Sequence, residues 1–345
     1  MQTHHTLHIG DARNMGVIAD ESVQLVATSP PYPMIEMWDE CFSQLDPGVG
    51  ASLAARAAPV AFQQMHAQLD IVWRECTRVL SPGGFLCVNI GDATRSIGDE
   101  FALYPNHARV VVAAQALGLT VLPDILWRKP TNAPNKFMGS GMLPAGAYVT
   151  YEHEYILIFR KGGKRRFSAD VERGRRLRSA FFWEERNLWF SDLWSGIVGS
   201  GQGADAISRK RSAAFPFEIP YRLINMYSLQ GDTVLDPFSG TGTTRLAAVA
   251  SARNSIGFEL DSSVDSAGLA PSDASGPRLA AHLSFVEGRK LRHHNTPHDF
   301  PVVTSQETEL ALPETLDVAQ IAPFAWRATH GVKQCLPPTF RDRPQ

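Results

Sequence analysis

The stretch DTVLDPFSGTGTTRLAAVASARNSIGFELD, residues 232–261, has the pattern of a strand, a glycine-rich turn, a helix and a second strand. Gly240 and Gly242 follow the first apolar run and come just before the helical segment. Glycines at this point let the backbone approach a ligand closely at a helix N-terminus, where free N–H groups attract electron-rich atoms. We therefore predict a ligand site at this turn.

Three classes of ligand compete for such a turn. A triphosphate is disfavoured because no lysine follows the glycines, as the phosphate-loop pattern requires. A dinucleotide is disfavoured because Arg245 stands where the third glycine of the dinucleotide pattern belongs. Glu259 ends the next strand, roughly 20 residues past the glycines, where an acid can bind ribose hydroxyls. The turn thus suits a nucleoside without a pyrophosphate, such as S-adenosylmethionine, although Glu259 could also be an ordinary solvent-facing acid.

Similar short apolar runs recur along the chain, and helix-like segments separate several of them. This alternation predicts an α/β protein with a mostly parallel sheet, in which ligands bind at the carboxyl ends of the strands. The glycine-rich turn and a second distinctive stretch, TSPPY at residues 28–32, both follow such runs. The runs are LHI, SVQLVAT, GGFLCVNI, LPDILW, EYILIF, DTVLD and NSIGFEL.

The composition excludes several classes of protein. With 345 residues, of which 44% are hydrophobic and 20% charged, the chain has enough apolar side chain for a sizeable core. No signal pattern or membrane span is predicted. No two cysteines form a CxxC pair, so we expect neither a metal site nor a disulfide framework. We expect a cytoplasmic location. They are Cys41, Cys76, Cys87 and Cys335.

A basic segment, RKGGKRRFSADVERGRRLR at residues 160–178, precedes an unusually aromatic one at residues 179–203. The sequence SRKR at residues 208–211 adds to the positive charge. Basic residues interleaved with aromatic ones are typical of phosphate and base contacts, although a solvated loop beside a small aromatic core would look the same. The candidate nucleic-acid-binding residues are Lys164, Arg165, Arg166, Arg175 and Arg176.

The sequence LDPFSGTGTT at residues 235–244, taken with TSPPY, closely resembles the amino-methyltransferases of DNA. These enzymes methylate the exocyclic N4 of cytosine or N6 of adenine with S-adenosylmethionine. The resemblance covers about residues 9–260, and the order of the two motifs resembles the circularly permuted beta class. It implies a Rossmann-like methyltransferase sheet, circularly permuted, with an inserted target-recognition region. The implied divisions are a catalytic half at 1–160, the insertion at 161–210, a cofactor-binding half at 211–292 and a tail of unknown role at 293–345.

The resemblance also implies which residues bind the cofactor. The turn itself and Glu259 at the ribose carry most of the contacts. Asp11, in the sequence HIGDA, is expected beside the adenine, and Phe215 and Pro216 near the methionine end. The turn residues are Asp236, Pro237, Phe238, Ser239, Gly240 and Gly242.

The chemistry of a base amine accounts for the residues of the TSPPY stretch. The lone pair of such an amine is conjugated into the ring, so the amine is a poor nucleophile. Acceptors must turn that lone pair out of the ring plane, and the Ser29 hydroxyl and Pro30 carbonyl can do so. Pro30 and Pro31 fix the backbone so that little entropy is left to lose. Tyr32 offers a face on which an extruded base can stack, although a tyrosine of the core is the alternative.

Within the family, SPPY occurs more with cytosine-N4 enzymes than with adenine-N6 enzymes, so cytosine N4 is preferred here on Ser29. Adenine N6, an inactive DNA-binding relative and an RNA methyltransferase remain alternatives. Methylation at C5 of cytosine is disfavoured because no cysteine follows a proline. The resemblance implies double-stranded DNA as partner. It also suggests a homodimer and a cognate restriction endonuclease that acts without direct contact.

Overall fold

The computed structural model describes residues 3–129, 138–139, 144–181, 183–197 and 215–262. The SRKR sequence and the tail at 293–345 lie outside the described residues.

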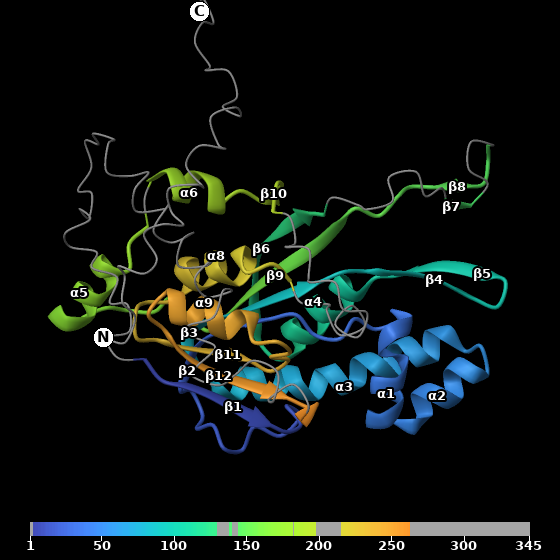
Figure 1. Cartoon of the computed structure of the whole chain (residues 1–345), viewed down its shortest axis with the longest axis horizontal. Helices are drawn as coiled ribbons and strands as arrows, with labels where there is room; N and C mark the ends of the chain where they lie inside the picture. Colours follow the sequence, from blue (N-terminus) through green and yellow to red (C-terminus); the bar gives the residue numbers. More distant parts are fainter. Residues whose placement is uncertain (1–2, 130–137, 140–143, 182, 198–214, 263–345) are drawn as a thin grey trace, which may run out of the picture.

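An eight-stranded sheet forms the centre of the protein, in the order β1-β12-β11-β2-β3-β9-β6-β10 (Figure 1). All neighbouring strands are parallel except that β9 runs antiparallel to both β3 and β6. The predicted α/β fold with a mostly parallel sheet is confirmed. The strands are β1 (His5–Ile9), β2 (Val23–Thr28), β3 (Leu80–Ile90), β6 (Leu119–Arg128), β9 (His153–Lys161), β10 (Leu193–Trp194), β11 (Thr233–Asp236) and β12 (Asn254–Glu259).

The ends of the described chain meet within this sheet. Strand β1, near the N-terminus, pairs in parallel with β12, the last described strand, from His5 opposite Ser255 to Ile9 opposite Glu259. Strand β11 then lies between β12 and β2. Sheet order therefore brings the glycine-rich turn after β11 next to the TSPPY stretch after β2, although they are far apart in sequence.

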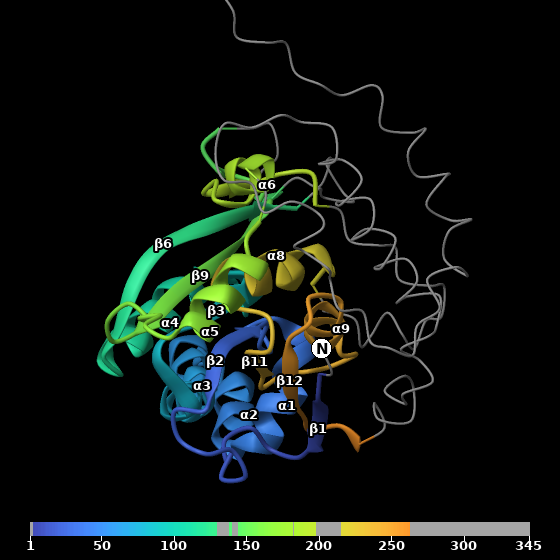
Figure 2. The ribbon, with the colours of Figure 1, turned by 90° about the vertical axis from the view of Figure 1, so that its left-hand side faces the viewer.

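Helices cover both faces of the sheet, and each face has its own apolar core (Figure 2). Helices α3 and α4 pack on one face and α8 and α9 on the other. The helices are η1 (Glu36–Trp38), α1 (Asp39–Leu45), α2 (Pro47–Ala54), α3 (Ala58–Val79), α4 (Asn106–Ala116), α5 (Asp170–Arg178), α6 (Trp183–Trp189), α8 (Glu218–Tyr227) and α9 (Thr243–Ala250).

Strand β2 shows why the central runs are continuously apolar. Val26 faces the core that contains α3, whereas Leu25 and Ala27 face the core that contains α8. Because successive side chains point to opposite faces, a strand covered on both sides needs apolar residues at every position. The sequence VQLVAT meets this need from Leu25 to Ala27, between the polar residues Gln24 and Thr28.

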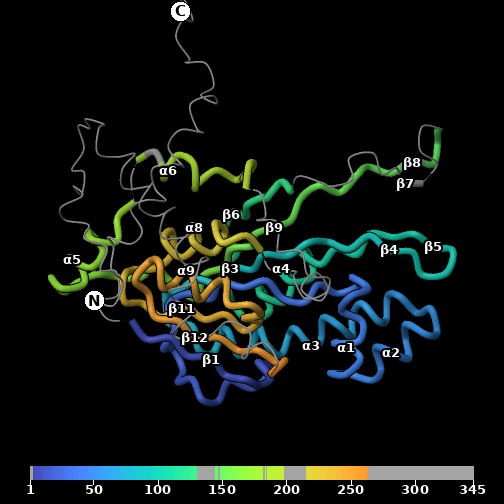
Figure 3. The backbone as a smooth tube through the Cα atoms, viewed as in Figure 1, coloured from blue at the N-terminus to red at the C-terminus, as the bar shows by residue number. Residues whose placement is uncertain are grey.

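Different elements lie at the two ends of the sheet. The hairpin of β4 (Ala93–Ile97) and β5 (Glu100–Tyr104) and the short pair β7 (Met138–Gly139) and β8 (Ala147–Tyr148) project at the carboxyl end of the parallel strands (Figure 3). Phe101 of one hairpin stacks on Tyr148 of the other, with ring centroids 4.7 Å apart. Helix α5 lies at the opposite end, near the N-terminus (Figure 1).

No helix in the described ranges is long and apolar enough to span a bilayer. Those ranges also contain no cluster of His, Cys, Asp or Glu side chains suited to a metal ion.

Candidate active site

The glycine-rich turn has the geometry that its sequence predicts. Strand β11 ends at Asp236, and Gly240 and Gly242 adopt left-handed backbone angles, with φ of +49° and +78°. Gly242 is the N-cap of α9, whose first residue is Thr243. Only glycine adopts these angles without strain, so the turn reverses sharply and leaves a helix N-terminus at the carboxyl edge of the sheet.

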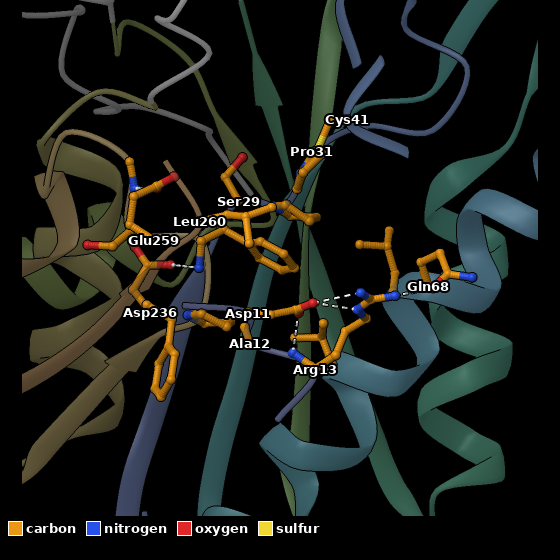
Figure 4. A pocket seen from close by; sticks show the side chains of 18 of the residues that line it. Asp11, Ala12, Arg13, Ser29, Pro31, Cys41, Gln68, Asp236, Glu259 and Leu260 are labelled. Carbon is orange, nitrogen blue, oxygen red and sulfur yellow. Dashed lines mark hydrogen bonds and ion pairs between the residues drawn. The ribbon is translucent and has the colours of Figure 1, made fainter. Parts of the chain in front are cut away.

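A pocket with a cavity volume of about 180 Å³ opens at this turn (Figure 4). Glu259 lies on one side, Arg13 and Gln68 on the opposite side, and Ser29 and Pro31 at a third side. The residues of the two motifs therefore line one cavity. Of the predicted site residues, those in its lining are Asp11, Ser29, Pro30, Pro31, Phe215, Asp236, Pro237, Phe238, Ser239, Gly240 and Glu259.

Three of the predicted catalytic and cofactor-binding residues lie outside that lining. Gly242 is the N-cap of α9, and the Pro216 carbonyl accepts a hydrogen bond from the Ile219 N–H at the start of α8. The Tyr32 hydroxyl contacts the Ser29 hydroxyl at 3.2 Å. Asp11 does line the pocket, but Arg13 binds its carboxylate through an ion pair of 2.7 Å. This pairing keeps the pKa of Asp11 below its ordinary value although partial burial opposes it.

The Glu259 carboxylate is held in place by the backbone. Its Oε2 accepts from the Gly240 N–H at 2.8 Å, and its Oε1 accepts from the Asp261 N–H at 2.9 Å. Each carboxylate oxygen has a second lone pair, so the group can still accept hydroxyl hydrogens from a ribose. Apolar walls, which include Leu69, Val72 and Phe258, complete a pocket that fits a nucleoside.

Asp236 is the buried acid at the base of the pocket. Its Oδ1 accepts from the Thr28 hydroxyl at 2.6 Å and from the Phe238 N–H at 3.1 Å. Burial raises the pKa of Asp236 to about 6, and these hydrogen bonds offset part of the rise.

The TSPPY stretch leads into a buried polar network. The Ser29 and Tyr32 hydroxyl oxygens are 3.2 Å apart, and the Tyr32 hydroxyl donates to Oε2 of Glu154 at 2.8 Å. The side chain of Asn89 donates to both the Tyr32 hydroxyl and Glu154 Oε2, and Lys129 Nζ lies 2.5 Å from Glu154 Oε1. Burial and the neighbouring Glu154 raise the pKa of Tyr32 well above its ordinary value, so its hydroxyl stays neutral.

Sequence reasoning missed Asn89, Lys129 and Glu154. Asn89 stands near the end of β3, and Glu154 is the second residue of β9. Because β9 is antiparallel, its first residues lie at the carboxyl end of the parallel strands, beside the site. A charged residue directly before the apolar run YILIF was the available signal, and Glu154 is only 7% exposed.

The basic segment at residues 160–178 does not line the pocket. The backbone of Arg165 lies against Gly83 near the start of β3, and its side chain pairs with Asp232, directly before β11, at 2.6 Å. Arg175, in α5, pairs with the same carboxylate at 2.8 Å. Both contacts are at the amino end of the parallel strands, because Asp232 directly precedes β11, whereas the pocket lies at their carboxyl end. Figure 1 shows α5 at that amino end. Asp232 engages both side chains, and the prediction that Arg165 and Arg175 contact nucleic acid stays a prediction.

Lys164, Arg166 and Arg176 are exposed members of the same segment. Lys164 and Arg176 line a second cavity of about 860 Å³ at this amino end, separate from the pocket. The basic segment therefore does not share a surface with the reacting residues.

The aromatic segment also has a structural role in the part that is described. Trp189 and Trp194 are 4% and 1% exposed and belong to the core beneath α8. The Trp194 indole N–H donates to the Trp189 carbonyl at 3.0 Å. The aromatic-core alternative is correct for these two side chains.

Comparisons with known proteins agree with this geometry. The family model described as DNA methylase, of the N6/N4 type, matches residues 23–266. The Type II methyltransferase M.MthZI of Methanothermobacter thermautotrophicus is 47% identical over 322 residues, which are 90% of this chain and 91% of that protein. The Type II methyltransferase M.MjaI of Methanocaldococcus jannaschii is 50% identical over 273 residues, 76% of this chain and 89% of that protein.

A solved structure is similar as well. TTHA0409 of Thermus thermophilus, assigned as a DNA modification methylase and crystallised with S-adenosyl-L-methionine, has a TM-score of 0.60 and 30% identity. The match covers 81% of this chain and 94% of that protein. Sequence, fold and site thus agree, and this chain belongs to the N6/N4 family of DNA methylases.

Proposed function

We propose that this DNA methyltransferase transfers a methyl group from S-adenosylmethionine to the exocyclic N4 of cytosine in duplex DNA. The observation that carries the proposal is that Ser29 and Pro30 line the same pocket as the glycine-rich turn and Glu259. A site for a nucleoside cofactor and acceptors for a base amine therefore meet in one cavity. The cocrystal of TTHA0409 with S-adenosyl-L-methionine supports the choice of cofactor.

When bound, S-adenosylmethionine supplies an electrophilic methyl group on a positively charged sulfur. Glu259 would hold the ribose hydroxyls, and the left-handed backbone at Gly240 lets the chain approach the nucleoside closely. The apolar lining excludes water from the reacting atoms.

Ser29 and the Pro30 carbonyl would orient the amine. Each accepts one N–H, which turns the nitrogen lone pair out of the base plane and toward the cofactor side of the pocket. The amine proton can leave after transfer, so no general base is needed beforehand. The preference for cytosine rests on the hydroxyl of Ser29 at the first position of SPPY, the form more frequent among cytosine-N4 enzymes.

The DNA would approach the carboxyl end of the sheet, where the two hairpins joined by Phe101 and Tyr148 project. Base extrusion is required because a stacked, paired base cannot reach a pocket of this kind. A homodimer and a cognate restriction endonuclease remain predictions from the family resemblance.

The test is product identification. The purified chain is incubated with labelled S-adenosylmethionine and either duplex DNA of mixed sequence or RNA, and the nucleosides are analysed by mass spectrometry. N4-methylcytosine is expected. N6-methyladenine would reverse the base assignment while keeping the site, and label on RNA alone would contradict the substrate class. No product on any substrate would indicate an inactive binding relative.

A further inference from the structure

The buried polar network of Ser29, Tyr32, Asn89, Lys129 and Glu154 is a chain of hydrogen bonds in which each donor and acceptor can be assigned. Glu154 pairs with the Lys129 ammonium at 2.5 Å and also receives an N–H of Asn89 at 2.7 Å. A carboxylate between such donors is ionised and can only accept hydrogen bonds. The 2.8 Å contact between Tyr32 and Glu154 therefore uses the phenol hydrogen of Tyr32.

The remaining bonds of Tyr32 are then fixed by counting. A phenol has one hydrogen and can accept two hydrogen bonds. Asn89 supplies one donor at 2.8 Å, and its orientation is fixed because the reversed amide would place its oxygen against the Glu154 carboxylate. The 3.2 Å contact with Ser29 must then be a bond that the serine hydroxyl donates.

We propose that Glu154 is a positioning residue that, through Tyr32, makes Ser29 a hydrogen-bond acceptor toward the target amine. With its only hydrogen committed to Tyr32, the Ser29 oxygen keeps its lone pairs for the pocket that it lines. Without Glu154, Tyr32 can donate to Ser29 instead, and the serine hydrogen then points at the N–H groups of the amine. The inference rests on the proposed function, because it takes a base amine as the group that Ser29 meets.

The orientation of the chain can be measured without turnover. Neutron diffraction from crystals of the perdeuterated protein locates hydroxyl deuterium atoms. The expected result is deuterium on Tyr32 directed at Glu154 and deuterium on Ser29 directed at Tyr32. A Ser29 deuterium directed into the pocket, or a Tyr32 deuterium directed at Ser29, overturns the proposal whether or not the protein is active.

A double-mutant cycle tests the consequence for catalysis. Glu154→Leu removes the acceptor and is expected to lower kcat about tenfold or more, with the affinity for S-adenosylmethionine, measured by calorimetry, changed less than about threefold. Tyr32→Phe is expected to cause a similar loss. Because both act through one hydroxyl group, adding Glu154→Leu to Tyr32→Phe should cost less than about a further twofold. Multiplicative losses would mean that Glu154 does not act through Tyr32.

Two control variants separate this role from a merely structural one. Glu154→Gln keeps an oxygen that can accept from Tyr32 and Asn89, so it should recover most of the rate lost in Glu154→Leu. Glu152→Leu removes a neighbouring carboxylate that pairs with Arg128 at 3.3 Å outside the network, and kcat should be unchanged. Equal losses in Glu154→Gln and Glu154→Leu would contradict the proposal.

The outcomes also separate the inference from the proposed function. If the wild-type protein methylates no nucleic acid, the proposed function fails, and the neutron measurement still decides the direction of the chain. If it methylates DNA but the cycle is multiplicative, the function stands and the role of Glu154 is rejected.

Discussion

The Thr28 hydroxyl donates a 2.6 Å hydrogen bond to the buried carboxylate of Asp236, across 208 residues of sequence. Thr28 ends β2 directly before Ser29, and Asp236 ends β11 directly before the glycine-rich turn. Because β2 and β11 are neighbours in the sheet, this bond joins the strand end that carries the amine acceptors to the one that carries the cofactor turn. A displacement of either strand end would move both halves of the site.

The burial of Asp236 predicts a pH-dependent stability. Its pKa is about 6 in the folded protein against an ordinary value of 3.8, so the folded state binds a proton more readily than the unfolded state. Stability from this group is therefore highest below the ordinary value and falls as the pH rises toward about 6. The side chain in Asp236→Asn cannot ionise, so this variant does not lose stability from this group as the pH rises. Its free energy of unfolding, relative to wild type, should increase by up to about 3 kcal/mol between about pH 4 and pH 7 in urea denaturation. A constant difference would show that burial does not perturb this acid.

The left-handed backbone at Gly240 predicts a specific loss of cofactor affinity. A β-branched residue is strained at a φ of +49°, and relief of the strain would shift the N–H that holds Glu259. We expect Gly240→Val to weaken S-adenosylmethionine binding by about tenfold or more in calorimetry.

Gly118 provides the matched control for this prediction. It has a φ of +79°, nothing within 4 Å of an added Cβ, and a place in the connection between α4 and β6, away from the pocket. Gly118→Val should therefore lose stability with unchanged cofactor affinity. Equal losses of affinity in the two variants would contradict the assignment of the turn.

The ion pairs of Asp232 predict a structural role for two arginines. The carboxylate is 2% exposed and receives both Arg165 and Arg175. Removing it leaves two partly buried cations without this partner, so Asp232→Ala should lower the free energy of unfolding by about 3 kcal/mol. The rate of methyl transfer per folded molecule should not change. Impaired transfer with normal stability would point to a functional role instead.

The position of the basic segment predicts little contribution to DNA affinity. Each phosphate contact on duplex DNA contributes about 0.9 to the slope of log affinity against log salt. For the variant Lys164→Gln, Arg166→Gln, Arg176→Gln we expect a slope within about 0.9 of wild type, since Lys164 and Arg176 line the cavity at the amino end of the sheet, opposite the pocket, and Arg166 belongs to the same segment. A slope reduced by about 2.7 would show that all three contact phosphates after all.

The α/β sheet, the glycine-rich turn and the TSPPY stretch could all be predicted from the order of the residues alone. Each depends on local properties, namely apolar periodicity, the left-handed angles of Gly240 and Gly242, and the fixed backbone of two prolines. The sequence also placed both stretches at strand ends, where parallel sheets bind their ligands.

The polar side chains that surround Tyr32 could not be predicted in this way, because they come from strands that meet only in the folded protein. Lys129 and Glu154 join Tyr32 because the antiparallel strand β9 begins at the edge where the parallel strands end. Arg165 and Arg175 pair with Asp232 because sheet order brings this carboxylate, at the amino end of β11, beside both side chains. The partner of a charged side chain depends on sheet order and strand direction, and these are set by packing across the whole chain rather than by neighbouring residues.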